Sequence, residues 1–245
     1  MAKLRAVLLA AGRGVRMGGS GPKALIPLDN KEPPLHYLLK TLERTGIEDL
    51  MVITGFGWQA VEAYLADHSE GFQVGYARNA RFASWGNFHS VRMALDQSPG
   101  MDVLVLNSDI VIAPAVVERA VASDADLVLA VQRRRRLEPE DMRVELDGDT
   151  VRSIGKGIKM VRSHGEFCGV SIIRPRGARA YGDIATALEW RAETGLYYED
   201  VYAQMLGSIE ARATAVEEDE YAEVDSPEDV AGAVAVVEQH EQSWS

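Results

Sequence analysis

The chain has 245 residues, 47% of them hydrophobic, and a formal net charge of −11. This length and composition predict one large or two small domains with a sizeable core, and they argue against disorder. The acidic balance argues against nucleic-acid binding through a general basic surface. The single cysteine, Cys168, excludes a disulfide or a multi-cysteine zinc site within the chain.

No apolar run in the sequence approaches the roughly 20 residues that span a bilayer. The apolar stretch near the N-terminus, LRAVLLA, is short for a signal-peptide core and leads into a glycine turn. We therefore expect no membrane partner and a reducing, cytoplasmic setting.

Apolar runs alternate with helical patterns along the chain, as is typical of a layered α/β domain. Strands are predicted over residues 4–10, 50–54, 72–77, 102–109, 126–131, 167–173 and 212–216. Helices are predicted over 35–42, 58–67, 87–97, 114–122, 177–194 and 198–206, and a last one opens at Ser226. Between 132 and 166, charged and apolar residues alternate around Asp147-Gly148-Asp149, which predicts an inserted β-hairpin. We expect a single domain over residues 1–245.

The stretch LLAAGRGVRMGGSGPKALIPL joins an apolar strand to a glycine-rich turn and a second apolar run. Gly12 and Gly14 let the backbone turn sharply and bring N–H groups toward phosphate oxygens, while Arg16 and Lys23 add positive charge. No lysine in the stretch is followed by serine or threonine at the P-loop spacing, and Met17 stands where a dinucleotide fingerprint has its third glycine. The alternative is a glycine-rich loop with solvated basic residues.

This stretch resembles the signature of the sugar-nucleotidyltransferase-like superfamily, AAGxGxRM followed by PKxL. The resemblance implies a Rossmann-like three-layer α/β/α sandwich with a mostly parallel central sheet. It also implies that an acceptor oxygen attacks the α-phosphorus of a nucleoside triphosphate, with Arg16 and Lys23 as catalytic residues that neutralise the phosphates. The nucleotide would be bound by Leu9, Ala10, Ala11, Gly12, Gly14, Arg16, Lys23 and Ser108.

Two aspartates are candidate Mg²⁺ ligands. Nucleotidyl transfer concentrates negative charge on phosphoryl oxygens, and a divalent metal stabilises that charge. Asp109 follows the buried run DVLVLNS, at the edge where open α/β sheets bind ligands, and Asp225 precedes the final helix. Both positions match the superfamily pattern of a metal-binding pair. The alternatives are a strand-end turn residue for Asp109 and a residue that assists the helix N-terminus for Asp225.

Two further stretches resemble phosphocholine and phosphonate cytidylyltransferases. In NARFASWGNFHSVRMAL, the residues Asn79, Asn87 and Ser90 match positions that would contact the nucleotide or the acceptor. Capping of the following helix by Asn87 is the alternative. Near the hairpin, Lys156 and Glu166 match a lysine followed by GExxG, which implies acceptor binding by both. Lys156 would act catalytically by orienting the acceptor's phosphoryl oxygens, or would be a solvated hairpin residue.

Further acceptor contacts are less well marked in the sequence. Choline recognition needs aromatic faces around a quaternary ammonium, for which the candidates are Trp85, Trp190, Tyr197 and Tyr198. We assign Trp85 and Tyr198 to the acceptor, with packing in the core as the alternative. Glu199 and Asp200 would offset an amine, approach the metal, or simply be solvated at a helix start. In the run Arg133–Arg136 we assign Arg133 to the acceptor, with most of the run solvated.

Together these observations predict an Mg²⁺-dependent nucleotidyltransferase that joins CMP from CTP to a small phosphorylated alcohol or phosphonate, of the phosphocholine or alkylphosphonate type. One alternative is a sugar-1-phosphate or cyclitol-phosphate nucleotidyltransferase that uses UTP, ATP or GTP, since phosphates look alike in all nucleotides. Another is a nucleotide-binding regulatory domain without catalysis, which would be expected to lack a metal carboxylate. A homodimer is a further expectation, from the resemblance alone.

Overall fold

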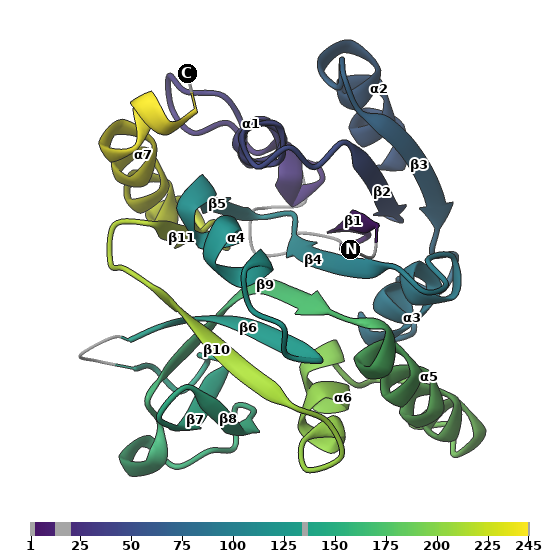
Figure 1. Ribbon diagram of the computed structural model, residues 1–245. Coiled ribbons are helices and arrows are strands. Elements are labelled where there is room, and N and C mark those ends of the chain that lie inside the picture. The colour runs from purple at the N-terminus through teal and green to yellow at the C-terminus, as the bar shows by residue number, and fades with distance from the viewer. Residues whose placement is uncertain (1–2, 13–20, 134–136, 245) are drawn as a thin grey trace.

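The computed structural model describes residues 3–12, 21–133 and 137–244, and nine strands in these ranges form one sheet (Figure 1). The strands are β1 (Leu4–Ala10), β2 (Asp49–Thr54), β3 (Gln73–Arg78), β4 (Asp102–Asn107), β6 (Leu127–Gln132), β7 (Arg143–Asp147), β8 (Thr150–Ile154), β9 (Gly165–Ile173) and β10 (Ala211–Val216). Their order in the sheet is β3-β2-β1-β4-β9-β6-β10-β8-β7. Every strand predicted from the apolar runs is present, close to its predicted ends.

Most strands of this sheet run in one direction. β1 pairs in parallel with β2 and β4, β2 pairs in parallel with β3, and β6 pairs in parallel with β10. β9 runs antiparallel to both β4 and β6 and joins these two groups. The expected Rossmann-like, mostly parallel sheet is confirmed, with β9 reversed at its centre and β8 reversed near one edge.

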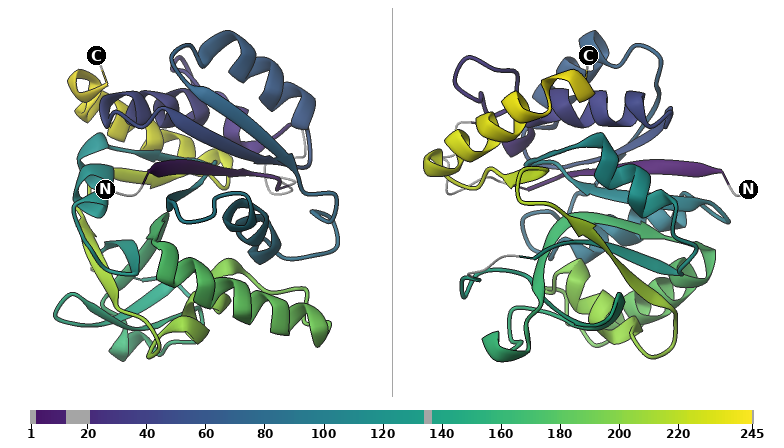
Figure 2. Two further views of the ribbon diagram at one scale, coloured as in Figure 1. Left: turned by 45° about the vertical axis from the view of Figure 1, so that its right-hand side comes forward. Right: turned by 60° about the vertical axis from the view of Figure 1, so that its left-hand side comes forward.

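Helices cover both faces of the sheet and complete a three-layer α/β/α sandwich (Figure 2). One face carries α1 (Pro34–Arg44), α2 (Trp58–His68) and α4 (Pro114–Val121), and the other carries α3 (Phe88–Asp96), α5 (Pro175–Trp190) and α6 (Tyr198–Met205). Successive side chains of β1 alternate between these layers: Ala6 and Leu8 pack in the first core and Val7 in the second. Because both faces are covered, the strands read as continuous apolar runs. Within the described ranges, no helix combines the length and apolar character needed to span a membrane.

A small second sheet lies beside the first and was not predicted. Its strands β5 (Ile110–Ile112) and β11 (Tyr221–Glu223) pair antiparallel, and α7 (Val230–Gln239) packs against them. The backbone N–H of Val224 donates a 2.8 Å hydrogen bond to the carbonyl of Asp109. Three-residue strands are too short to show a periodicity in the sequence, yet this pair holds the segment after β11 against the end of β4.

The predicted hairpin is formed by β7 and β8, which pair antiparallel around Gly148. Gly148 has φ +64°, a left-handed conformation that glycine adopts without a steric penalty. β7 also pairs with β9, and β8 with β10. The insertion therefore extends the edge of the main sheet and stays attached to it.

Candidate active site

A cavity of about 510 Å³ opens where β1 and β4 end, at the sheet edge where α/β proteins bind ligands. Leu9, Ala10, Ala11 and Gly12, all predicted to bind the nucleotide, line it at the end of β1. The carbonyl of Ala11 accepts a 3.1 Å hydrogen bond from the N–H of Phe56. A Cβ on Gly55 would lie 2.7 Å from the same carbonyl oxygen, so only glycine permits this close approach. The contact fixes the backbone from which the glycine turn departs.

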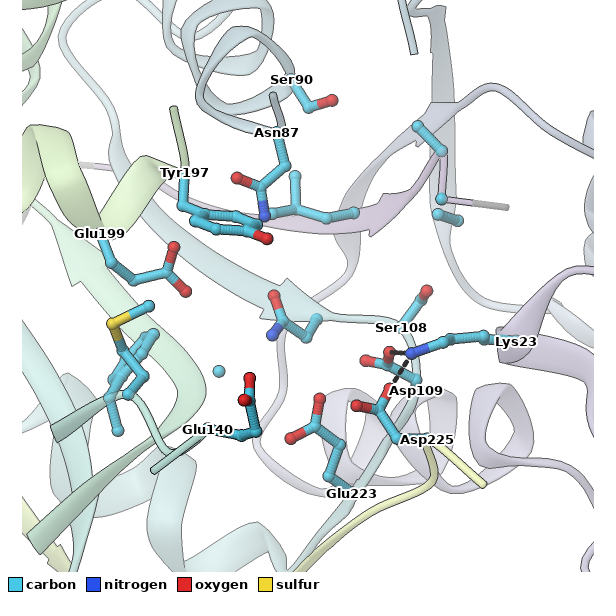
Figure 3. Close-up of a pocket in the computed structure, with 18 of the residues that line it drawn as sticks. Lys23, Asn87, Ser90, Ser108, Asp109, Glu140, Tyr197, Glu199, Glu223 and Asp225 are labelled. Carbon is cyan, nitrogen blue, oxygen red and sulfur yellow. Dashed lines mark hydrogen bonds and ion pairs between the residues drawn. The ribbon is translucent and has the colours of Figure 1, made fainter. Parts of the chain in front are cut away.

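Lys23 enters the cavity from the short 3₁₀ turn η2 (Lys23–Leu25), directly after the buried Pro22. Its Nζ atom lies 2.9 Å from Oδ2 of Asp109 and also forms an ion pair with Asp225 (Figure 3). The Lys23 side chain is 21% exposed, so a ligand in the cavity can reach its ammonium group. Three of the predicted residues, Lys23, Asp109 and Asp225, are thus in contact. Gly14 and Arg16 lie outside the described residues.

Three carboxylates gather around this lysine. One oxygen each of Asp109, Glu223 and Asp225 lies within 4.8 Å of the others. Burial, followed by the nearby charge of Asp109, raises the pKa of Glu223 to about 7. Oxygen donors of this kind suit Mg²⁺, and a divalent cation would relieve the repulsion among the like charges. Sequence analysis does not single out Glu223, although its two-residue spacing from Asp225 places both on one face of an extended strand.

The last helix is capped without the side chain of Asp225. Oδ2 of Asp229 accepts hydrogen bonds from the backbone N–H groups of Asp225 and Ser226, at 3.0 and 2.7 Å. Ser226 and Asp229 form the capping box of this N-terminus. The carboxylate of Asp225 instead contacts Lys23 (Figure 3). Its position is therefore that of a cavity residue and not of a helix cap.

The polar residues expected around the nucleotide occupy different positions. Asn87 and Ser90, at the start of α3, line the cavity, whereas Asn79 is 1% exposed and is not among the described lining residues. Nδ2 of Asn79 donates a 2.9 Å hydrogen bond to Oγ of Ser90, so Asn79 holds Ser90 in place. Asn87 does not cap α3 with its side chain. Its Oδ1 accepts a 2.9 Å hydrogen bond from the backbone N–H of Tyr198 and ties α6 to α3.

Asn107 is a lining residue at the end of β4 that sequence analysis does not single out. Gly169 on β9 has φ +69°, and a Cβ there would lie 2.6 Å from Nδ2 of Asn107. From the other side, the hydroxyl of Tyr198 donates a 3.0 Å hydrogen bond to Oδ1 of Asn107. The amide is therefore held between β9 and α6. Because Ser108 and Asp109 follow directly and both line the cavity, this packing also positions the segment just after β4 that carries Asp109.

The other end of the cavity is formed by the hairpin, β9 and the start of α6. Lys156 and Glu166, both predicted, line it together with Tyr197 and Glu199. Nζ of Lys156 lies 3.6 Å from Oε2 of Glu140 and 5.6 Å from the centroid of the Tyr197 ring. Glu199 is 7% exposed, and burial raises its pKa to about 8. This end of the cavity thus offers acidic groups beside an aromatic ring.

The two aromatic residues assigned to the acceptor lie away from the cavity surface. The Trp85 ring stacks on Phe88, with centroids 6.1 Å apart, and is covered by the guanidinium of Arg81. Tyr198 is fully buried, and the adjacent Tyr197 lines the cavity instead. Neighbouring residues at a helix start face different directions, so only packing decides which of two tyrosines is exposed.

The arginine run lies beyond the end of β6. Arg133 is exposed and is not among the described residues that line the cavity. Arg134, Arg135 and Arg136 lie outside the described residues. A role for Arg133 at the acceptor therefore stays a prediction.

Part of this chain is similar in sequence to known proteins. The profile of the MobA-like NTP transferase domain matches residues 6–167, more than half of the chain. The chain is 35% identical over 152 residues to a CMP-5'-(3-aminopropyl)phosphonate synthase of Streptomyces rubellomurinus, covering 59% of this chain and 23% of that protein. It is 27% identical over 141 residues to a D-glycero-alpha-D-manno-heptose 1-phosphate guanylyltransferase of Aneurinibacillus thermoaerophilus, covering 55% and 60%. The chain thus spans less than two thirds of the length of these relatives.

Solved structures with the same fold cover nearly the whole chain. The inositol-1-phosphate CTP transferase from T. maritima superposes with a TM-score of 0.80 at 19% identity, over 97% of both chains. The CTP:phosphocholine cytidylyltransferase from Streptococcus pneumoniae gives a TM-score of 0.74 at 20% identity, over 93% of this chain and 96% of that one. This likeness confirms the Rossmann-like α/β fold. Because the family profile matches residues 6–167, a range that includes Lys23 and Asp109, the chain belongs to the family of MobA-like NTP transferase domains.

Proposed function

We propose that this protein is a nucleotidyltransferase that uses Mg²⁺ to join CMP from CTP to a small phosphorylated alcohol or phosphonate. The observation that carries the proposal is the contact of Lys23 with both Asp109 and Asp225 at the ligand-binding edge of the sheet. A lysine beside a group of carboxylates supplies both parts that a phosphate chain needs, a fixed positive charge and a metal site. The NTP transferase family of the chain supports this chemistry.

In the proposed reaction, an oxygen of the acceptor's phosphate or phosphonate attacks the α-phosphorus of CTP. A new P–O bond forms, the bond from the α-phosphorus to the oxygen that bridges to the β-phosphate breaks, and pyrophosphate leaves with that electron pair. Lys23 neutralises charge on the phosphoryl oxygens, together with Arg16. At the other end of the cavity, Lys156 directs the acceptor's phosphoryl oxygens toward the nucleotide.

Asp109 and Asp225 are the proposed ligands of Mg²⁺, with Glu223 beside them. The donors are all carboxylate oxygens, and three of them face the single ammonium of Lys23, so a divalent cation fits both the ligand type and the charge. When bound, the metal would supply Lewis-acid stabilisation of the phosphoryl oxygens. Lys23 partly offsets the repulsion between the aspartates.

The preference for CTP rests on the relatives. The names of one curated relative and of two solved structures contain CMP or CTP, whereas another relative is a guanylyltransferase. Asn87 and Ser90 line the cavity with an amide and a hydroxyl, which both donate and accept hydrogen bonds and do not by themselves select one base. A sugar-1-phosphate or cyclitol-phosphate nucleotidyltransferase is therefore the second candidate.

The test is pyrophosphate release from CTP, UTP, ATP and GTP, each with Mg²⁺ and a panel of acceptors. The panel contains phosphorylated alcohols, alkylphosphonates and sugar 1-phosphates, and Lys23→Ala is the matched control. We expect CTP with a phosphate or phosphonate of the small type to give the highest turnover. Release from another nucleotide with a sugar 1-phosphate would favour the second candidate, and silence with every pair would contradict nucleotidyl transfer.

A further inference from the structure

The cavity extends from the metal-site carboxylates to Glu199 on α6, where the proposed function leaves a carboxyl group unexplained. Figure 3 shows the Glu199 carboxyl group pointing into the cavity, on the side away from Lys23. The side chain is 7% exposed, and its Oε2 atom makes no hydrogen bond with the described residues. A buried carboxyl oxygen without a partner is costly, so a ligand group that donates a hydrogen bond there would gain substantially.

The surroundings of Glu199 favour a positively charged ligand group. Glu140 and Asp141 line the same end of the cavity, and the half-exposed ring of Tyr197 offers an aromatic face. The one cation at this end among the described lining residues, Lys156, lies against Glu140, 3.6 Å from its Oε2. Acidic groups thus exceed basic ones here, and an added ammonium would favour the ionised form of Glu199 and improve the charge balance.

Glu199 is also held firmly in place. The backbone N–H of Tyr198 donates to Oδ1 of Asn87 at 2.9 Å, which fixes the start of α6 against α3. The hydroxyl of Tyr198 donates to Oδ1 of Asn107 at 3.0 Å, which fixes the same turn against β4. Both contacts involve the residue before Glu199. A carboxyl group on a rigid element can discriminate between ligands by small differences in position.

We propose that Glu199 binds a primary ammonium group of the acceptor, so that the substrate is an aminoalkyl phosphate or aminoalkylphosphonate. The inference rests on the proposed nucleotidyl transfer and adds the chemical class of the acceptor. A primary ammonium carries N–H donors that can satisfy Oε2 of Glu199, whereas a trimethylammonium carries none. A quaternary ammonium is instead bound by several aromatic faces. Among the described lining residues the aromatic ones are Phe167, which is 4% exposed, and Tyr197.

Three acceptors with one phosphonate scaffold test this assignment: 2-aminoethylphosphonate, its N-trimethyl counterpart and ethylphosphonate. Each is assayed for pyrophosphate release with the preferred nucleotide, Mg²⁺ and the full chain. We expect the primary amine to have a kcat/KM about 100-fold or more above the other two, because a site built for a hydrogen-bond donor rejects ligands that lack one. Equal or higher values for the trimethyl or amine-free acceptor in the unmodified protein would overturn the proposal.

Glu199→Gln should lower this preference to less than about tenfold and leave the KM for the nucleotide unchanged. The matched control is Glu193→Gln, an exposed residue just before α6 that is not among the described lining residues; it should keep the full preference. A Glu199→Gln variant that is folded by thermal unfolding and still prefers the primary amine about 100-fold would contradict the role of Glu199.

The acceptor panel separates failure of this inference from failure of the proposed function. If the nucleotide releases pyrophosphate as fast with ethylphosphonate or the trimethyl compound as with the primary amine, nucleotidyl transfer stands and the ammonium site is wrong. If no nucleotide releases pyrophosphate with any phosphate or phosphonate acceptor, the proposed function itself is wrong, and so is the inference that rests on it.

Discussion

Nζ of Lys23 lies 2.9 Å from Oδ2 of Asp109, although 86 residues separate the two in the sequence. The contact follows from the pairing of β1 with β4, which run parallel as neighbours from Leu4↔Asp102 to Leu9↔Asn107. Parallel neighbours end at the same edge of a sheet, so the residues at the ends of β1 and β4 line one cavity. Lys23 of the family signature meets Asp109 and Asp225 there.

Removal of the Lys23 ammonium should reduce catalysis with little loss of stability. In Lys23→Ala we expect kcat/KM for pyrophosphate release to fall by about 100- to 1,000-fold, because charge on the phosphoryl oxygens loses its fixed partner. Lys31→Ala is the control, since Lys31 pairs with Glu241 at 3.9 Å and is not among the described lining residues. Near-normal kcat/KM in Lys23→Ala would remove this lysine from the mechanism.

The three carboxylates should differ from ordinary acidic surface residues in their response to metal. In Asp109→Asn and Asp225→Asn we expect the Mg²⁺ concentration for half-maximal activity to rise at least about tenfold, because each variant loses an anionic oxygen ligand. In Glu223→Gln this Mg²⁺ concentration should rise less, because Glu223 lies beside the proposed metal ligands. Chelation with EDTA should abolish turnover, and added Mg²⁺ should restore it. Titration of activity against Mg²⁺ measures all of these, and unchanged curves in both aspartate variants would exclude the assigned site.

The close approach of β9 to Asn107 should make Gly169 intolerant of a side chain. In Gly169→Ala the φ of +69° costs about 1–2 kcal/mol, and the new Cβ would lie 2.6 Å from Nδ2 of Asn107. Gly148→Ala shares the positive φ, of +64°, but its Cβ would meet nothing within 4 Å. Urea unfolding should therefore show a larger loss of stability in Gly169→Ala, and only this variant should lose activity. Equal losses in the two variants would mean that Asn107 moves aside without cost.

Glu199 should make the stability of the protein depend on pH. Burial raises its pKa from the ordinary value of 4.5 to about 8, so between these values the folded state holds a proton that the unfolded state has released. The contribution of the Glu199 proton to the free energy of unfolding is fully present below about pH 4.5 and is lost as pH rises through about 8. Between these values the free energy of unfolding falls by up to about 1.4 kcal/mol per pH unit. The free energy of unfolding in urea should therefore fall more between about pH 6 and pH 9 in the unmodified protein than in Glu199→Gln.

Other groups also affect the pKa of Glu199 or the pH dependence of stability. Hydrogen bonds with its own backbone and with the side chain of Tyr198 lower the pKa of Glu199, whereas the charges of Asp200 and Glu223 raise it. The pKa of Glu223, itself raised to about 7, gives a loss of stability of the same sign, but this group is present in both proteins and largely cancels in the difference. Parallel pH profiles for the two proteins would show that the Glu199 carboxyl group is not perturbed as described.

The sheet predicts how the protein unfolds. β9 pairs with β4 on one side and with β6 on the other, so it links the strands around β1 to those around β10. We therefore expect residues 1–245 to unfold as a single domain, in one cooperative transition seen alike by tryptophan fluorescence and by far-ultraviolet circular dichroism. Two separated transitions would divide the chain into two units at β9.

Much of the architecture could be predicted from local patterns. The buried strands, the helices between them and the turn at Gly148 each leave a periodicity or a turn residue in the sequence. Lys23 and Asp109 could be predicted as well. Lys23 belongs to a recognisable signature, and Asp109 follows an apolar strand. The ends of β9 and α5 and the short strands β5 and β11 were less well marked, because their lengths depend on neighbours in the fold.

The sequence by itself determined the α/β layering and marked Lys23 and the two aspartates as candidate site residues, because these patterns depend on residues close together in the chain. Only the tertiary structure decided which side chains share the cavity. It added Glu223, brought Glu199 to the cavity, placed Tyr197 and not Tyr198 at the cavity surface, and put Asn79 behind Ser90. The physical reason is that the direction of a side chain depends on strand pairing and helix packing between distant segments. The charge of a carboxyl group likewise depends on the burial that this packing imposes.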